Sequence, residues 1–265
     1  MTVVVGVAAY DGIILAADSR STWFQPEGVR ARVISDNAIK LFTVGDCAIA
    51  TYGTAIIGPQ SIAGLIDEFV AQLDDTSIEA ETLARELGDF FADRFNSAYP
   101  DFDADNGWAL GFLVAGYNGD GVGRLYEVLV PTREVTEHVS TQTLGGITRG
   151  QYDIVDRVIY GVDWHRLLVD GISEEVQERL GQLRFHLILP STLQDAIDFA
   201  MFIIRTTIDM QRFSDGTLGN AGSFPTCGGP IRVLSVTRGG VEWIADRPLT
   251  APAHHGHPRA EGETD

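Results

Sequence analysis

The sequence predicts an α+β protein in which two sheets pack on each other and helices cover their outer faces. Three observations support this prediction. The segments follow the order strands, two helices, strands, two helices, strands. The first strand is apolar on both of its alternations, which is typical of a strand covered on both faces. The chain has 265 residues, 45% of them hydrophobic, and can therefore bury a substantial core.

A hairpin is predicted at the start of the sequence. Residues 3–9 are small and apolar with several β-branched side chains, and residues 10–12 (Tyr-Asp-Gly) carry a tight-turn signal. Residues 13–17 are predicted to form the return strand. A hairpin of this length returns Asp18 toward Thr2, so the two residues are expected to lie at the same end of a sheet.

The next segment mixes a loop with a second hairpin. Residues 21–33 are polar and mixed in character, which predicts a loop. Residues 38–43 and 47–52 form a second hairpin-like pair around a Gly-Asp turn at 45–46. We therefore expect two further strands before the first helix.

Two helices are predicted after this pair. Apolar residues recur at helical spacing over positions 62–73. The second helix is expected to begin with a capping box formed by Thr76 and Glu79, and its apolar stripe covers 83–95. Residues 100–106 end the helix pair, which is expected to pack on a sheet.

Sheet structure is predicted to return in the middle of the sequence. Residues 109–117 and 124–130 are expected to form two strands joined by a glycine-rich turn over 118–123. A third, shorter strand is predicted over 134–139.

A second helical region is predicted from residue 152 onward. One helix is expected over 152–160, and part of the following stretch, 174–183, has helical character, whereas apolar residues alternate over 185–189. A further helix is expected to begin at Ser191, with Gln194 as its capping-box partner.

The sequence is expected to close with a hairpin and a tail. Residues 215–230 are rich in Gly, Ser, Pro and Asn and are predicted to form a loop. Residues 231–237 and 241–244 are predicted to form the closing hairpin. One domain is therefore expected over 2–247, followed by a disordered tail over 248–265 with little apolar content.

The composition disfavours several classes of function. The net charge of −18 would repel nucleic-acid phosphates. The two cysteines can form neither a disulfide framework nor a Cys-x-x-Cys metal pair, which fits a reduced cytoplasmic setting. The sequence starts without the basic and apolar regions of a signal peptide and has no run of about 18 apolar residues. We therefore expect a cytoplasmic protein that binds no membrane and no nucleic acid.

Thr2 is a candidate nucleophile because of its position. If Met1 is removed, a single residue carries both a hydroxyl and a free α-amine. A neutral hydroxyl attacks carbonyls poorly and needs a base, and an α-amine with a pKa of about 8 can serve as that base near neutral pH. An ordinary first-strand residue is the alternative interpretation, because many chains begin with Met-Thr.

The sequence resembles the proteasome-type N-terminal nucleophile hydrolases, and more closely a divergent bacterial proteasome-like homologue than an ordinary proteasome β subunit. The resemblance extends from Thr2 to about Ile244 and implies a four-layer αββα sandwich. Four segments carry it: Thr-Val-Val-Val-Gly at 2–6, Asp-Gly-Ile-Ile-Leu-Ala-Ala-Asp-Ser-Arg at 11–20, Ile-Lys-Leu-Phe at 39–42, and Val-Ala-Gly-Tyr at 114–117 with Gly-Arg-Leu-Tyr at 123–126.

The resemblance implies roles for several residues near the amino terminus. Thr2 corresponds to the nucleophile, and Lys40 would place a positive charge beside it, which favours the neutral amine and the developing alkoxide. Asp18 would pair with Lys40, because a buried ammonium needs a partner. Arg20 would support the same loop through hydrogen bonds. A solvated lysine and a turn-capping aspartate are the alternative interpretations of two of these residues.

The resemblance also implies an oxyanion-stabilising N–H in the turn Gly53-Thr54-Ala55. Ala55 aligns with the donor, and Gly53 lies two positions earlier. A backbone donor tolerates a change of side chain, and small residues let a substrate approach closely. A simple turn between strand and helix is the alternative.

The sequence departs from the family pattern in two places. Gly146 aligns with a serine that supports the terminal amine, and Thr148 is a candidate to supply the missing hydroxyl. The family has an aspartate shortly before a Ser-Gly-Gly sequence, whereas this sequence has Cys-Gly-Gly at 227–229 with no aspartate at that spacing. Asp209 is the candidate replacement, with Asp215 as an alternative.

Other chemistry-bearing residues have simpler explanations. Cys227 lies in a Gly/Pro-rich loop with no histidine near it in sequence, so a small loop residue is favoured over a reactive thiol. The histidines at 254–257 are explained by a polar tail rather than a metal site. The glycine-rich stretch 219–229 is not followed by Gly-Lys-Ser/Thr, which excludes a P-loop phosphate cradle.

The resemblance therefore predicts a threonine-nucleophile hydrolase that acts on a peptide or amide substrate. Neither a metal nor an organic cofactor is expected. A homo-oligomer, as a ring or a stacked array, is expected because members of this family commonly form such assemblies. A catalytically inactive structural or assembly subunit and an amidase acting on a non-peptide amide are the alternatives that the two departures leave open.

Overall fold

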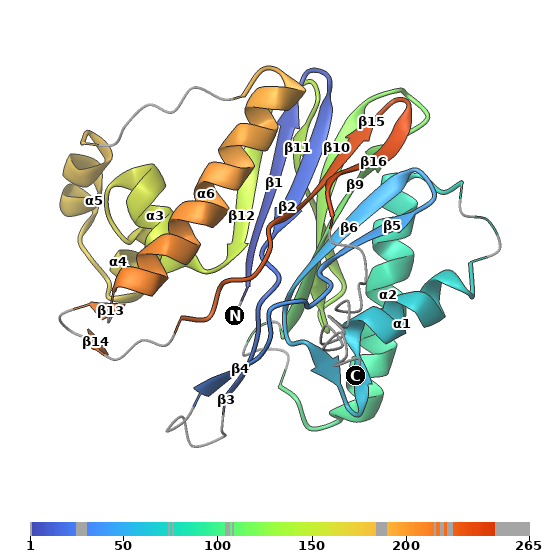
Figure 1. Cartoon of the computed structure of the whole chain (residues 1–265), viewed down its shortest axis with the longest axis horizontal. Coiled ribbons are helices and arrows are strands. Elements are labelled where there is room, and N and C mark those ends of the chain that lie inside the picture. Colours follow the sequence, from blue (N-terminus) through green and yellow to red (C-terminus); the bar gives the residue numbers. More distant parts are fainter. Residues whose placement is uncertain are drawn as a thin grey trace, which may run out of the picture.

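The structure is a computed structural model, and its described residues form two five-stranded antiparallel sheets that lie face to face (Figure 1). The strand orders are β12-β1-β2-β15-β16 and β11-β10-β9-β6-β5. The residues that the structure describes are 2–24, 31–73, 75, 77–103, 107, 109–183, 190–214, 216–217, 220–221 and 225–246.

The first sheet is built on the predicted amino-terminal hairpin, and the closing hairpin pairs with it. Val4 lies opposite Ala17 and Leu234 lies opposite Leu15, so the first and last strands of the domain share one sheet. The strands of this sheet are β1 (Val3–Ala9), β2 (Gly12–Ala17), β12 (Gly145–Gly150), β15 (Arg232–Thr237) and β16 (Gly240–Ala245).

The second sheet contains the strands predicted in the middle of the sequence. β9 pairs with β10 on one side and with β6 on the other. β5 begins later than predicted, because the N–H of Ala38 donates to the carbonyl of Ser19 and draws residues 38–40 toward the first sheet. The strands are β5 (Leu41–Val44), β6 (Cys47–Gly53), β9 (Leu110–Tyr117), β10 (Gly123–Val130) and β11 (Glu134–Ser140).

Helices cover the outer face of each sheet (Figure 1). α1 (Ile62–Val70) and α2 (Ala80–Ala98) share an apolar cluster with the second sheet, and α3 (Tyr152–Tyr160) and α6 (Leu193–Phe213) share one with the first. A third cluster fills the space between the sheets. This arrangement explains why β1 is apolar on both alternations, since its two faces contact different layers.

β1 illustrates how the two faces separate. Val3, Val5 and Val7 pack with apolar residues of α6, whereas Val4 and Ala8 face the second sheet. All of them are fully buried. Because side chains alternate along a strand, the register of β1 also decides that the side chain of Thr2 follows the inward direction of Val4.

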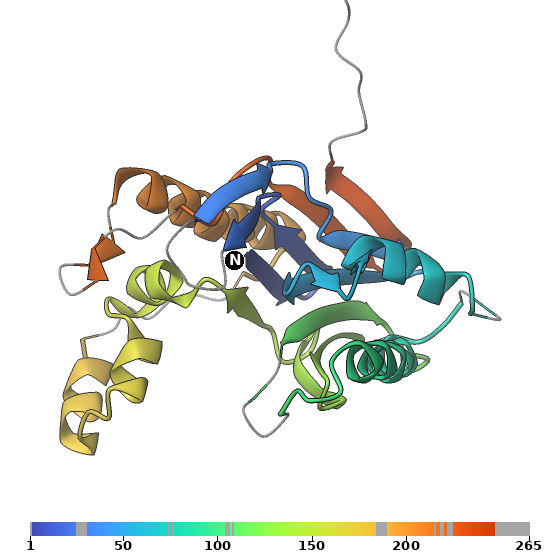
Figure 2. The same cartoon turned by 90° about the horizontal axis from the view of Figure 1, so that it is seen from below.

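Two short helices extend the fold beyond its sheets. α4 (Trp164–Val169) and α5 (Glu174–Gly181) lie to one side of the body in Figure 2. Neither has a buried residue. α5 matches the helical character predicted for 174–183, and α4 was not predicted because six residues are too short for a periodic stripe. The alternating segment 185–189 lies outside the described residues.

Several predicted loops contain short strands. β3 (Ser21–Phe24) and β4 (Ala31–Ser35) pair with each other where a loop was predicted, because a ribbon of four paired positions is too short to give a clear alternation. β12 was missed because its glycines lower strand propensity, yet it pairs with β1 over six positions. Two-residue pairs also form, namely β7 (Ile56–Ile57) with β8 (Gln60–Ser61) and β13 (Gly216–Thr217) with β14 (Asn220–Ala221).

Both predicted capping boxes are wrong in detail. α2 begins after Glu79, whose carboxylate accepts the N–H of Gly119 at 2.8 Å and makes no cap hydrogen bond; Thr76 lies outside the described residues. α6 is capped by Thr192 rather than Ser191. The Thr192 hydroxyl accepts the N–H of Asp195 at 3.2 Å, so the box is shifted by one residue.

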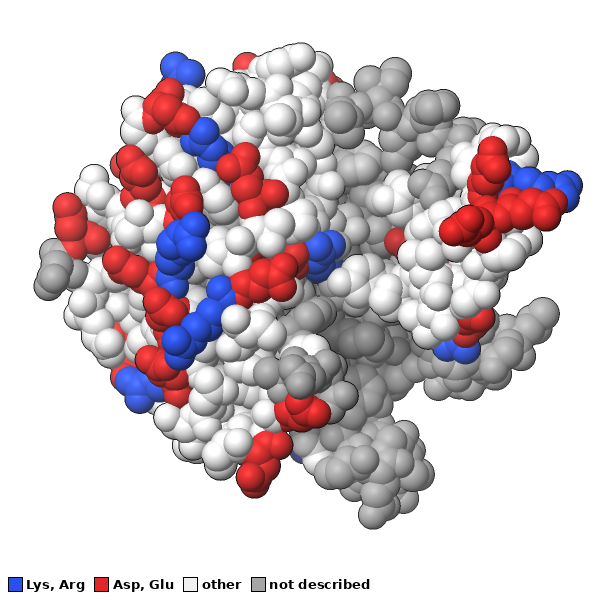
Figure 3. Space-filling view, turned by 180° about the vertical axis from the view of Figure 1, so that it is seen from behind, with Lys and Arg blue, Asp and Glu red and all other residues white. Residues whose placement is uncertain are grey.

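The surface carries its negative charge in mixed clusters. Figure 3 shows acidic side chains alternating with basic ones over one side of the molecule. Arg124, for example, contacts Asp120 and Glu137, and Arg133 contacts Asp93. Exposed pairs of this kind contribute at most about 1 kcal/mol each, so the core rather than these pairs stabilises the fold.

Candidate active site

Asp18 is the hub of a buried polar site at the start of β1. Among the described residues, its carboxylate accepts four hydrogen bonds. Oδ1 accepts from Lys40 Nζ at 2.7 Å and from the Val3 N–H at 3.1 Å. Oδ2 accepts from the Arg20 N–H at 3.1 Å and from the Gly228 N–H at 2.9 Å. Asp18 is 1% exposed, so its charge is fully satisfied within the protein.

The ion pair expected between Lys40 and Asp18 is present, and it joins the two sheets. Lys40 is 7% exposed and directly precedes β5 of the second sheet. Its carbonyl accepts the N–H of Thr51 on β6 at 2.9 Å, whereas its ammonium reaches Asp18 at the end of β2. A buried cation therefore lies beside the strand that Thr2 begins.

Thr2 is held on both sides of its main chain. It is 6% exposed, and the following N–H, that of Val3, bonds to Asp18. On the other side, its carbonyl lies against Gly150, the last residue of β12, where φ is +96°. A Cβ on Gly150 would lie 1.8 Å from the Thr2 oxygen, so only glycine fits there.

Replacing Gly150 with alanine is expected to displace Thr2 and destabilise the fold by about 3 kcal/mol or more, because the added Cβ collides with main chain at a strained φ. The matched control is Gly161→Ala, where φ is +80° but nothing lies within 4 Å of the Cβ. The unfolding free energy of that variant should fall by only about 1–2 kcal/mol. Equal losses of unfolding free energy in urea denaturation would contradict the proposed contact.

Arg20 supports the loop beside Asp18, as expected, through its guanidinium. Nε and one terminal nitrogen donate to Asp36 at 2.7 and 3.1 Å, and the other donates to the carbonyl of Pro225 at 3.3 Å. The hydrogen bond with Asp36 raises the pKa of Arg20 and lowers that of Asp36. A Cβ on Gly228 would lie 2.5 Å from the guanidinium carbon, so this group packs directly on the Gly228 backbone.

A buried network of neutral polar side chains lies behind the site and was not predicted. Thr226 Oγ1 donates to Gln151 Oε1 and accepts from Gln211 Nε2, both at 3.2 Å. Gln211 Oε1 accepts the N–H of Cys227 at 2.8 Å. The network links α3 and α6 to the segment whose Gly228 N–H reaches Asp18. A sequence signal existed, since Gln211 continues the buried stripe of α6 that includes Thr207.

Two predicted site residues are not brought to Thr2. Thr148 lies opposite Val5 on β1 and lines a cavity of about 480 Å³ together with Phe199 of α6, so it faces the helix layer. Asp209 is exposed on α6, because the helix turns Gln211 inward instead. Asp215 lies outside the described residues.

The alignment of Gly146 with the family's serine is also corrected. Gly146 lies opposite Val7, near the far end of β1. The β12 residue level with the start of β1 is Gly150, opposite Val3, and it is followed by Gln151. The three glycines of β12 provide no side-chain alternation that would fix the register from sequence, so strand pairing is needed to place Gly146.

The predicted turn Gly53-Thr54-Ala55 follows directly from β6. Gly53 has φ of +98°, and a Cβ there would lie 2.6 Å from the carbonyl oxygen of Ala109. That same oxygen accepts the N–H of Thr54 at 3.0 Å. Ala55 is exposed, and within the described part of the chain its N–H donates to no backbone carbonyl outside the strands and helices, which makes it a candidate donor to a ligand.

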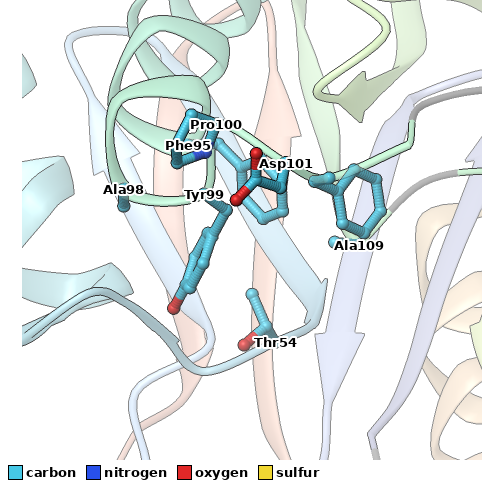
Figure 4. A pocket seen from close by; sticks show the side chains of 8 residues that line it. Thr54, Phe95, Ala98, Tyr99, Pro100, Asp101 and Ala109 are labelled. Atoms are coloured by element: carbon cyan, nitrogen blue, oxygen red, sulfur yellow. The ribbon is translucent and has the colours of Figure 1, made fainter.

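An apolar pocket of about 520 Å³ opens beside this turn (Figure 4). Thr54 forms one wall, and the aromatic rings of Phe95 and Tyr99 form another. Phe95 lies 5.0 Å from Tyr99 between ring centroids. Asp101 supplies a carboxylate at the wall. The pocket has the size and apolar lining typical of small-ligand and side-chain sites.

Cys227 lies within the site but is not a reactive thiol. It is 1% exposed, and burial raises the pKa of its thiol to about 12. Cys47 is also buried, with its pKa raised to about 12 for the same reason. Both thiols are therefore protonated at neutral pH, whereas a thiolate is the nucleophile. The interpretation of Cys227 as a small structural residue is favoured.

In the parts of the chain that the structure describes, no three His, Cys, Asp or Glu side chains gather in a way that would hold a metal ion. The histidines at 254–257 lie outside those parts. No described helix combines the length and the hydropathy needed to cross a bilayer.

A second ionic cluster is buried between the sheets. Glu127 on β10 accepts hydrogen bonds from Tyr52 and from Arg149, one of them from an Arg149 terminal nitrogen at 2.8 Å, and contacts His138 Nε2 at 2.8 Å. Burial alone would raise the pKa of Glu127. The hydrogen bonds from His138, Arg149 and Tyr52 outweigh burial and hold this pKa at about 2.

This cluster is expected to make the protein acid-sensitive. The pKa of Glu127 is lower in the folded state than its ordinary value of 4.5, so the carboxylate stabilises the fold above about pH 4.5 and this contribution is lost as the pH falls toward 2. Its size is about 3 kcal/mol. The difference in unfolding free energy between the wild type and Glu127→Gln should shrink as the pH falls from about 4.5 toward 2. A constant difference down to pH 3 would contradict this assignment.

Comparisons with known proteins show which solved structures have a similar fold. No protein-family model matches the sequence, and no curated protein matches it significantly. Among solved structures, Anbu (ancestral beta-subunit) from Yersinia bercovieri is similar, with a TM-score of 0.56, 15% identity, and coverage of 92% of this chain and 87% of that one. The Anbu (Gly-1) mutant from Hyphomicrobium sp. strain MC1 has a TM-score of 0.56 at 15% identity, covering 95% and 88%. A second structure of Anbu from the same strain has a TM-score of 0.53 at 14% identity, covering 94% and 88%.

At this level of identity the similarity establishes the fold alone. The chain has a mixed α and β, proteasome-like fold that extends over nearly its whole length. The chemistry of the site has to be argued from its own residues.

Proposed function

We propose that the protein is a threonine-nucleophile hydrolase of the proteasome-like type, in which Thr2 becomes the first residue after removal of Met1. The two sheets and their outer helices are then the four-layer αββα sandwich of N-terminal nucleophile hydrolases. The observation that carries the proposal is the buried Lys40–Asp18 pair, whose carboxylate also binds the N–H of the residue after Thr2. A bare structural turn needs no buried ammonium at this point.

The arrangement supports acyl transfer in two steps. The Thr2 hydroxyl attacks the substrate carbonyl carbon while the α-amine takes its proton, directly or through a water molecule. Lys40 favours the neutral amine and the developing negative charge on the threonine oxygen. The Ala55 N–H binds the carbonyl oxygen as it becomes an oxyanion. The amine then protonates the leaving amine, and water hydrolyses the Thr2 ester by the reverse proton path. Neither a metal nor an organic cofactor takes part.

The pocket beside Thr54 supports a preference for substrates with apolar side chains. Its aromatic wall lies next to the turn that would bind the oxyanion. A side chain close to the reacting carbonyl would therefore enter it. We propose a peptide or amide with an apolar residue at this point as the substrate, a homo-oligomer such as a ring or stacked array as the assembly, and the cytoplasm as the location.

A non-catalytic assembly subunit is the second candidate, and one observation favours it. The resemblance implies a serine and an aspartate near the terminal amine, whereas the structure gathers the neutral side chains of Gln151, Thr226 and Gln211 behind Cys227. A proteasome-like fold without its polar support for the amine can serve in assembly alone. An amidase for a non-peptide amide has the same chemistry as the main proposal and differs only in substrate.

Mass spectrometry separates these candidates. The intact mass of the purified protein reports whether Met1 is removed. Incubation with a β-lactone, which acylates hydroxyl nucleophiles, followed by peptide mapping, reports whether Thr2 is modified. The hydrolase proposal expects loss of Met1 and acylation of Thr2. Retention of Met1, or an unmodified Thr2, supports the assembly subunit.

A further inference from the structure

Glu127 connects both halves of the candidate site although it belongs to neither. It lies on β10 in the second sheet and is 6% exposed. Its carboxylate accepts a hydrogen bond from Tyr52 of the same sheet and a fork from Arg149 of the facing sheet. His138 of β11 completes the cluster at 2.8 Å. A carboxylate held this completely has little freedom to move.

One arm of the cluster leads to the oxyanion turn. Tyr52 is 2% exposed and directly precedes Gly53, the first residue of that turn. β9 separates β6 from β10, and the Tyr52 ring crosses it over Gly111, where a Cβ would lie 2.2 Å from the ring. Gly111 therefore clears the path that lets the Tyr52 hydroxyl reach Glu127. The hydrogen bond between Tyr52 and Glu127 therefore connects the end of β6 to β10 in the interior of the protein.

The other arm leads to the candidate nucleophile. Arg149 lies opposite Val4 on β1 and directly precedes Gly150. Gly150 is the residue on which the Thr2 carbonyl packs. The third guanidinium nitrogen of Arg149 donates to the carbonyl of Thr148 at 3.0 Å, which fixes the side chain to its own strand. The position of Thr2 is thus connected to Glu127 through two consecutive residues of β12, Arg149 and Gly150.

We propose that Glu127 is a positioning residue that sets the separation between Thr2 and the turn Gly53-Thr54-Ala55. The inference rests on the proposed function and adds a residue to it. Glu127 touches neither the substrate nor the nucleophile. It acts through Tyr52 on the oxyanion donor and through Arg149 on the strand beside Thr2.

The need for such a device follows from where the two parts lie. Thr2 directly precedes β1 of the first sheet, whereas the turn begins at the last residue of β6 in the second. Apart from this cluster and the Lys40–Asp18 pair, the described interior between the sheets is largely apolar packing, which tolerates small sliding movements more readily than a fork of charged hydrogen bonds. A misplacement of about 1 Å can reduce a reaction rate about 100-fold. A directional link between the sheets prevents this loss.

The test uses Tyr52→Phe, which removes only the hydroxyl of the oxyanion arm and leaves the Glu127–Arg149 pair intact. Acylation of Thr2 by the β-lactone is followed by intact mass at several probe concentrations. The maximal acylation rate is expected to fall about 10- to 100-fold, whereas the half-saturating concentration stays within about twofold, because transition-state alignment rather than ground-state binding is lost.

The matched control is Tyr126→Phe. Tyr126 is the residue before Glu127 on the same strand, is 4% exposed, and accepts a hydrogen bond from Asn118 on the helix-facing side. The Tyr126→Phe variant should leave the acylation rate of Thr2 unchanged. Its loss of thermal stability should be similar to that of Tyr52→Phe. Amide hydrogen exchange gives a second readout that needs no reaction. Exchange over residues 53–55 should accelerate in Tyr52→Phe and not in Tyr126→Phe.

The outcomes distinguish the inference from the function on which it rests. A wild type whose Thr2 is not acylated overturns the proposed function and the inference with it. A wild type that is acylated, with Tyr52→Phe acylated at the same rate, overturns the inference alone. Equal losses of rate in both phenylalanine variants also overturn it, because the effect would then be general destabilisation. Unchanged exchange over residues 53–55 contradicts the positioning role directly.

Discussion

Replacing Thr2 with alanine is expected to abolish acylation by the β-lactone, with a fall of about 10⁴-fold or more in rate. The variant keeps the α-amine, Lys40 and the oxyanion turn but has no hydroxyl to attack the carbonyl. When a nucleophile and its base act as a unit, removing the nucleophile alone reduces the reaction rate about as much as removing both groups. The acylated fraction is measured by intact mass, with Met1 removal verified in the same spectrum.

Thr2→Ser is the matched control for this change. Serine keeps the hydroxyl and the α-amine and lacks only the methyl group, so its acylation should stay within about tenfold of the wild type. Both variants should unfold at nearly the same temperature as the wild type, because a single small side chain is altered. Acylation of Thr2→Ala at the wild-type rate would show that the probe reacts elsewhere and would remove the nucleophile from the proposal.

The sequence predicted those parts of the fold whose pattern is local. β1 was predicted because both of its faces are apolar, and β2 was predicted as its return strand after a tight turn; the structure confirms that the residues of both strands are buried. The ion pair of Lys40 with Asp18 was also anticipated, because the block around Asp18 resembles a known family. A hairpin of known length then fixes that Asp18 lies near Thr2.

The parts that failed depend on register and on helix rotation. Gly146 was aligned with a site position that the pairing of β12 gives to Gly150 and Gln151, and no local pattern separates registers in a glycine-rich strand. Asp209 was chosen for its charge, but α6 turns Gln211 inward. The links Gln211–Thr226 and Arg149–Glu127 join residues far apart in sequence. The helical stripe of α6 could have indicated that Gln211 is buried, but no local pattern identifies its partner or pairs Arg149 with Glu127.

The buried site therefore combines one charged pair with neutral support. Lys40 and Asp18 are both almost completely shielded from water. The polar groups behind them, Gln151, Gln211 and Thr226, add hydrogen bonds without adding charge. The backbone N–H groups that also bind Asp18 carry no full charge, so loss of Lys40 would leave the buried carboxylate without a counter-ion in direct contact.

Lys40→Met is accordingly expected to destabilise the protein by about 3–5 kcal/mol, because the Asp18 carboxylate stays buried without its counter-ion. Acylation of Thr2 should fall by at least about 100-fold, since the charge that favours the neutral amine and the developing alkoxide is gone. Urea denaturation measures the first effect, and β-lactone acylation under folding conditions measures the second.

Two variants test the cause of the Lys40→Met effect. Arg85→Met breaks the exposed pair with Glu81, whose side chains are 64% and 44% exposed, and should change the unfolding free energy by less than about 1 kcal/mol. Combining Lys40→Met with Asp18→Asn removes both buried charges and should be less destabilising than the sum of the two single changes. Strict additivity of the two changes in unfolding free energy would mean that Lys40 and Asp18 do not interact. The proposal that Lys40 is held beside Thr2 by Asp18 would then be contradicted.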